Sequence, residues 1–150
     1  MPNFRRSYNG GRFTSDVEDI VAVSEKRMIA LMRQSISDVI DNAQTPVGKG
    51  GRMRVDTGFL RASGQPSLNG MPQGPSRGER TEPNSYSYDE GNNVTVKLGD
   101  LQIGGVFYFG WTAAYARYRE LYDGFLEGAL QHWGRIVAFN TDTIRQRIKK

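Results

Sequence analysis

The triplet Asp56-Thr57-Gly58 has residue types that could hydrolyse a peptide bond. In that chemistry two aspartate carboxylates must face each other, because together they share a proton and activate a water molecule. The chain contains one such triplet, so a second copy of the chain would have to supply the other carboxylate. On this interpretation the protein is a homodimeric hydrolase that uses Asp56.

The residues around the triplet favour a structural role for it. In a retroviral-type aspartic protease the triplet follows an apolar strand and precedes a small residue. Here the flexible, basic residues 48–54 precede the triplet, and the bulky Phe59 follows it. Asp56 or Thr57 could instead cap a short helical turn by accepting a backbone N–H, while Gly58 relieves the tight entry into that turn.

The structural interpretation extends to the residues that follow. Phe59 and Leu60 would enter the core, and Arg61 would be placed to pair with a carboxylate, which another subunit could supply. We therefore predict no catalytic residue, no cofactor and no metal site. The lack of cysteine and the single histidine, His132, agree with the last of these, because zinc sites need clusters of thiolate or imidazole ligands.

A long helix is predicted near the N-terminus, from Ser15 to between Asn42 and Gln44. Ser15 and Glu18 fit a capping box, in which each side chain accepts a backbone N–H at the helix start. The helix should end before Thr45, because residues that precede a proline avoid helical geometry. At roughly 28 residues it would be about 42 Å long. One small sheet cannot cover all of the apolar stripe of such a helix, so partner subunits are expected to cover the remainder. The stripe consists of Val17, Ile20, Val21, Met28, Leu31, Met32, Val39 and Ile40.

The rest of the chain predicts a small antiparallel sheet and a second helix. Residues 93–99 alternate apolar and polar side chains, and residues 104–111 form a second apolar run, so the two are expected to pair as strands. Asp123 is expected to cap a final helix. Residues 64–93 are rich in Gly, Pro and Ser and should form a long loop or hairpin arm.

The predicted fold is α+β: one domain of 150 residues in which a long N-terminal helix and a C-terminal helix pack on a small antiparallel sheet.

Acidic and basic zones alternate along the chain, although the net charge is only +4. Residues 1–14, a predicted basic arm, carry three arginines and no acid; residues 15–44 carry six acids against three bases, and residues 45–80 carry six bases against two acids. Zones of this kind suit docking between copies at least as well as nucleic acid, which usually needs one concentrated basic patch. A basic nucleic-acid-binding module therefore stays as a second alternative.

Neither a membrane span nor a secretory signal is expected. No apolar run approaches the roughly 20 residues that cross a bilayer. The first residues also lack the apolar middle of a signal peptide. We expect a protein that is not secreted and has no membrane partner.

Four segments of the chain, in order, resemble the tail-completion family of long-tailed bacteriophages. Members typically have a long first helix, a P-V-D-T-G-x-L-R-x-S segment, a Y-A-x-Y-x-E segment, and an F-L-x-x-A-L start to the final helix. The resemblance covers roughly residues 15–140, with residues 48–54 inserted after Pro46-Val47 and residues 121–124 in place of a single glycine. The matching residues are Val55, Asp56, Thr57, Gly58, Leu60, Arg61, Ser63, Tyr115, Ala116, Tyr118, Glu120, Phe125, Leu126, Ala129 and Leu130.

The resemblance implies a non-enzymatic structural protein of the virion neck, a tail-completion or tail-terminator subunit. Such a subunit caps the finished tail tube and joins it to the DNA-filled head, usually in a closed ring of about six copies. The implied partners are other copies of the chain, the tail tube protein and the head-side connector or stopper proteins. DNA would pass through the lumen without sequence-specific binding. The implied location is the virion tail and neck, and the host cytoplasm during assembly.

Overall fold

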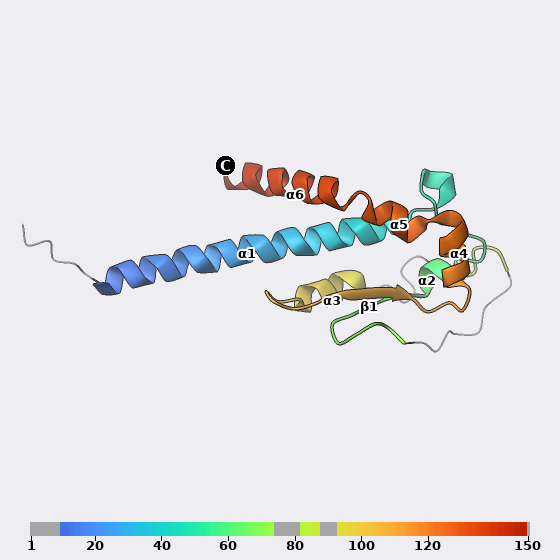
Figure 1. The fold of residues 1–150 in the computed structure, drawn as a ribbon, viewed down its shortest axis with the longest axis horizontal. Helices are drawn as coiled ribbons and strands as arrows, with labels where there is room; N and C mark the ends of the chain where they lie inside the picture. Colours follow the sequence, from blue (N-terminus) through green and yellow to red (C-terminus); the bar gives the residue numbers. More distant parts are fainter. Residues whose placement is uncertain (1–9, 74–81, 88–92, 150) are drawn as a thin grey trace, which may run out of the picture.

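A long N-terminal helix organises the fold. The computed structural model describes residues 10–73, 82–87 and 93–149. Helix α1 (Gly10–Ala43) runs along the molecule, with a two-stranded antiparallel sheet and helix α3 on one side of it and helix α6 on the other (Figure 1). The α+β fold predicted from the sequence, with a long N-terminal helix, a C-terminal helix and a small antiparallel sheet, is confirmed.

Helix α1 begins earlier than predicted. It spans 34 residues, or about 51 Å, and Ser15 lies inside it rather than at its N-cap. Once a helix is formed, each added residue gains a hydrogen bond without a new nucleation cost, so the helix extends through Gly10 to Thr14. The predicted basic arm over residues 1–14 is therefore helical from Gly10, and its residues 1–9 lie outside the described part. The predicted end before Thr45 is confirmed.

The strand predicted over residues 93–99 is wrong, since this segment forms helix α3 (Val94–Asp100). Leu98 is buried whereas Val96 is 69% exposed, although a strand would place both side chains on one face. Arg33 of α1 donates from Nη2 to two carbonyls at the C-terminal end of α3, at 2.9 and 2.7 Å. This long-range contact satisfies carbonyls that a helix end leaves open, and it favours the helix over the strand.

The two strands of the sheet are β1 (Gly64–Ser67) and β2 (Tyr108–Trp111). They are antiparallel, with Gly64 opposite Trp111 and Ser67 opposite Tyr108. The second strand, predicted over residues 104–111, is confirmed only for residues 108–111, and its partner comes from the start of the predicted arm over residues 64–93. Residues 74–81 and 88–92 of that arm lie outside the described part.

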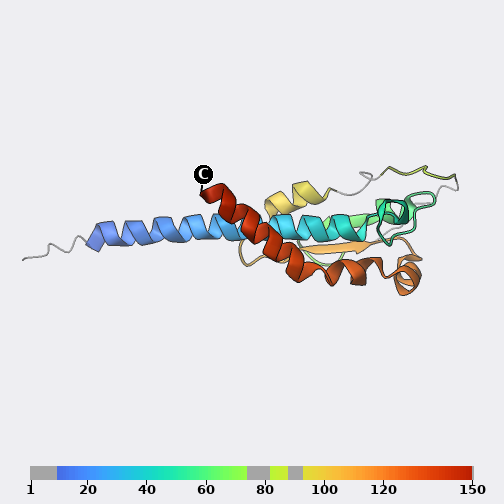
Figure 2. The same cartoon turned by 90° about the horizontal axis from the view of Figure 1, so that it is seen from above.

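The C-terminal region forms three helices instead of the single predicted one: α4 (Ala116–Asp123), α5 (Phe125–Leu130) and α6 (Trp133–Ile148). Gly124 separates the first two with a left-handed φ of 60°. After α5 the backbone tightens, because the His132 N–H donates to the Ala129 carbonyl at 3.1 Å, only three residues back. The resulting turn directs α6 back across α1 (Figure 2).

In the described part of the chain, two clusters of buried side chains form the core. The larger one lies at the end of the molecule where α2 (Phe59–Ala62) and α4 are found (Figure 1). A smaller cluster joins α1 to α5 and consists of Val39, Ala43 and Ala129. Trp111 packs against both, and its ring meets the Phe125 ring edge-on at 4.9 Å. The buried residues of the larger cluster are Met53, Phe59, Leu60, Tyr86, Ala113 and Phe125.

A buried polar contact fixes α6 against α1. Asn140 is 4% exposed, and its Nδ2 donates to Asp38 Oδ2 at 2.8 Å and to Ser35 Oγ at 3.3 Å. Ser35 itself is fully buried. Because buried amides and hydroxyls need hydrogen-bond partners, this contact sets where along α1 the last helix crosses.

Candidate functional site

The residues inserted before the triplet form a closed loop. The Val47 N–H donates to the Met53 carbonyl at 3.0 Å, and the Met53 N–H donates to the Thr45 carbonyl at 3.3 Å. At Gly51 an added Cβ would lie 1.9 Å from the Thr45 carbonyl oxygen, so the loop closes only with glycine there. Since the ends of the loop meet, the chain returns beside Pro46 at Met53, whose side chain is buried in the core.

The Asp56-Thr57-Gly58 triplet is the entry to helix α2. Thr57 Oγ1 accepts the Phe59 N–H at 3.1 Å, which is the kind of turn-stabilising hydrogen bond predicted for Asp56 or Thr57. Gly58 has a φ of 87°, and an added Cβ would lie 2.7 Å from the Tyr86 carbonyl oxygen. The carbonyls of Asp56 and Thr57 accept the N–H groups of Asn84 and Tyr86 at 2.9 and 3.0 Å. The backbone of the triplet therefore positions a distant segment of the chain.

The residues after the triplet enter the core as predicted. Phe59 and Leu60 are buried, and the Phe59 ring lies 5.3 Å from Tyr86 and 6.1 Å from Tyr115. Ser63 Oγ donates to the Leu60 carbonyl at 2.6 Å and so closes the last turn of α2.

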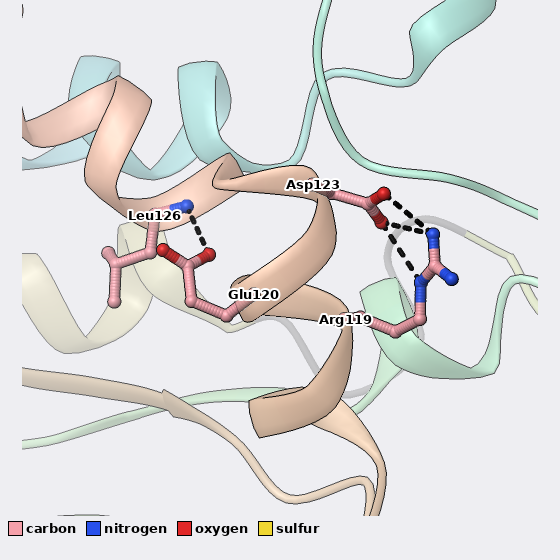
Figure 3. Close-up of polar contacts among 4 residues, drawn as sticks. All are labelled: Arg119, Glu120, Asp123 and Leu126. Atoms are coloured by element: carbon pink, nitrogen blue, oxygen red, sulfur yellow. Dashed lines mark hydrogen bonds and ion pairs between the residues drawn. The ribbon is translucent and has the colours of Figure 1, made fainter.

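Helix α4 supplies the cap of α5. Glu120 accepts the Leu126 N–H on Oε2 at 2.8 Å and the Glu127 N–H on Oε1 at 2.9 Å. Asp123, predicted as the cap, instead accepts a bidentate contact from Arg119 (Nη2–Oδ1 2.6 Å, Nε–Oδ2 3.0 Å). Figure 3 shows the two contacts on opposite sides of α4. The sequence did not predict Glu120 as the cap, because Glu120 lies in the preceding helix. The chain turns at Gly124, and this turn brings the Glu120 carboxylate to the N–H groups of α5.

Six of the fifteen residues that carry the family resemblance meet in the larger core cluster. Residues of all three short motifs contribute to the larger cluster or pack against it: Val55, Leu60, Tyr115, Ala116, Phe125 and Leu126. Ala129 lies in the smaller cluster. Tyr118 and Leu130 stay outside, since both are more than half exposed. Tyr86 and Met53 also belong to the core, although nothing in their polar and glycine-rich sequence surroundings predicted it.

A cleft of about 830 Å³ opens beside the triplet. Its volume lies within the range of about 300–1,000 Å³ that is typical of binding clefts. Pro46, Val47, Val55, Phe59, Leu60 and Tyr115 supply apolar lining. Four cationic side chains also line it against the single acid Asp56: Lys49, Arg54, Arg61 and Arg119. The cleft is thus partly apolar and carries a net positive charge.

The N-terminal half of α1 has an uncovered apolar face. Every residue from 14 to 28 is exposed, including Ile20 at 65% and Met28 at 58%. Val17 and Val21 lie on the same stripe of α1 as Ser35 and Val39, which the body of the molecule buries. In both views this part of α1 extends beyond all other described elements (Figures 1 and 2).

The described residues offer few other features that could bind a ligand. Over residues 10–73, 82–87 and 93–149 no group of three or more His, Asp or Glu side chains could hold a metal ion. Within the same described residues, no helix combines the length and hydropathy needed to span a bilayer. The basic cleft and the uncovered stripe of α1 are two surfaces of this part of the chain that a ligand or another protein could cover.

Comparison of the chain with protein-family models, with curated proteins and with solved structures found no match.

Proposed function

We propose that this protein is a structural subunit of a bacteriophage neck, a tail-completion or tail-terminator protein that assembles into a ring. The observation that carries the proposal is the apolar stripe of α1, which is buried at Val39 and continues uncovered to Val17. An exposed apolar face of this length marks a surface that another protein covers. The resemblance of the short motifs to the tail-completion family supplies the setting, at the junction of tail tube and head.

The arrangement around Asp56 supports the structural proposal over an aspartic protease. The triplet leads into a helix, and its backbone carbonyls hold residues 84–86. The protease alternative makes a simple prediction, since it requires the unmodified protein to cleave peptides at acidic pH and the Asp56→Asn variant to lose that cleavage. We expect no cleavage by either protein.

The charge distribution supports passage of DNA without sequence-specific binding. Basic residues are spread over the described part: four line the cleft, Arg145, Arg147 and Lys149 lie at the exposed end of α6, and others, such as Lys26, Lys97 and Arg117, lie elsewhere. A ring that releases DNA through its lumen needs few phosphate contacts, because each one strengthens binding and its dependence on salt. The nucleic-acid-binding alternative instead predicts tight DNA binding by the isolated protein, weakening steeply as salt is added.

Two measurements on the natural protein test the proposal. The purified chain, at micromolar concentrations, should form rings of about six subunits that are visible by negative-stain electron microscopy. Mass spectrometry of purified virions from the phage that encodes the chain should detect it. A protein that stays monomeric at every concentration and is absent from virions would overturn the proposal.

A further inference from the structure

The basic cleft and the uncovered half of α1 lie at opposite ends of the molecule. The cleft begins at Pro46, immediately after α1 ends at Ala43. Val17 lies 26 residues before Ala43, which in a straight helix is about 39 Å away. The stripe of one copy therefore cannot reach the cleft of the same copy, as the positions of α2 and of the free end of α1 also show (Figure 1).

The two surfaces are complementary in shape, since one is a helix and the other a cleft, and in charge. Over residues 14–25 the exposed helix carries four acids and no base, namely Asp16, Glu18, Asp19 and Glu25. Glu18 and Glu25 lie along one flank of the stripe, whereas Asp16 and Asp19 lie toward the opposite face of the helix. The cleft presents the opposite pattern, with apolar side chains such as Val47, which is 55% exposed, and the exposed cations Lys49 and Arg54. An amphipathic helix bound along an apolar groove is a common mode of recognition.

We infer that the N-terminal half of α1 of one copy docks in the basic cleft beside Asp56-Thr57-Gly58 of the next copy. Val17 and Val21 face the apolar lining, and Glu18 and Glu25 pair with Lys49 and Arg54. Each copy offers one helix and one cleft, so the contact is heterologous and repeats from copy to copy until it closes into a ring. The inference rests on the proposed self-assembly and identifies the surfaces that produce it.

Two variants, each damaged on one surface, test this contact. The helix variant Val17→Gln/Val21→Gln removes apolar side chains from the stripe, and the cleft variant Lys49→Glu/Arg54→Glu reverses the charge of the cleft. All four substituted side chains are exposed, so both variants should fold. Matched controls are Val23→Gln, on the far side of the same helix, and Arg117→Glu, an exposed base of α4 outside the cleft lining.

Sedimentation equilibrium gives the association constants. Each variant alone should associate at least about tenfold more weakly than the unmodified chain, because both of its possible contacts use a damaged surface. An equimolar mixture should form dimers of one helix variant and one cleft variant, because one intact helix and one intact cleft remain. Both control variants should assemble as the unmodified chain does.

The outcomes separate this inference from the proposed function. If the unmodified chain forms rings and either variant assembles equally well, the contact is wrong while the ring stands. A mixture that stays monomeric, or one that forms full rings, would also overturn it. A monomeric unmodified chain would overturn the contact too, and the presence of the chain in virions would then decide the proposed function separately.

Discussion

At the scale of single residues, the triplet that could have been catalytic acts through its backbone. Thr57 stabilises the entry to α2, and Gly58 allows the chain to pass within contact of the Tyr86 carbonyl. The Tyr86 ring packs at a tilt against the Phe59 ring in the larger core cluster, so the turn and the core depend on each other. The same residues therefore hold segments 56–59 and 84–86 together at this turn.

We predict that Gly58→Ala destabilises the protein by about 1–3 kcal/mol, because an alanine at positive φ is strained and its Cβ would meet the Tyr86 carbonyl. Thermal unfolding followed by circular dichroism measures the loss. Gly48→Ala is the matched control, since an added Cβ at Gly48 meets nothing within 4 Å. Equal melting temperatures for both variants would contradict the role assigned to Gly58.

Glu120 provides a second prediction at this scale. Glu120→Ala leaves two N–H groups of α5 without their carboxylate partner and should cost about 0.5–2 kcal/mol in free energy of unfolding. Urea denaturation of the variant measures the loss. Glu127→Ala, which removes an exposed carboxylate from the same turn, should cost less, so a reversed order of the two would exclude the capping role.

At the scale of elements, the contact between α1 and α6 depends on one buried amide. Asn140→Asp would place a carboxylate beside Asp38, whose Oδ2 lies 2.8 Å from the present amide nitrogen. We predict a loss of about 2–3 kcal/mol at pH 7, and a smaller loss near pH 4, where protonation relieves the repulsion. Chemical denaturation at the two pH values measures both.

Phe139→Asp is the control for this prediction, because Phe139 is 70% exposed on the same helix. It should change the free energy of unfolding little at either pH. An Asn140→Asp variant as stable as this control would show that the amide does not fix the crossing of α6.

The elements differ in how far their sequences predicted them. The helical spacing of apolar residues, sustained over many turns, predicted α1, and the proline after it predicted its end. Local residue types predicted the turn that leads into α2. The alternation of apolar and polar side chains over residues 93–99 predicted a strand wrongly, because a segment of seven residues fits the periods of both a strand and a helix. The deciding contact comes from Arg33, which is distant in sequence. The pairing of β1 with β2, and the position of Tyr86 in the core, also depend on contacts between distant segments that no local pattern encodes.

At the scale of the whole molecule, the fold presents different surfaces at its two ends. One end carries the basic cleft and exposed side chains of α4, with Leu121 and Tyr122 at 76% and 83% exposure. The other end is a bare amphipathic helix. A subunit whose two unlike surfaces bind each other would assemble head to tail, and closure of such a chain would produce a ring with a central channel. This asymmetry is the physical basis of the proposed neck role.

The most direct test of that role is the position of the chain in the virion. Electron microscopy of virions in which the chain carries a gold-binding tag should show the label at the junction between head and tail, and at no other place. Label on the capsid surface, along the tail shaft or at the distal tail tip, or its absence from virions that contain all other structural proteins, would contradict the account.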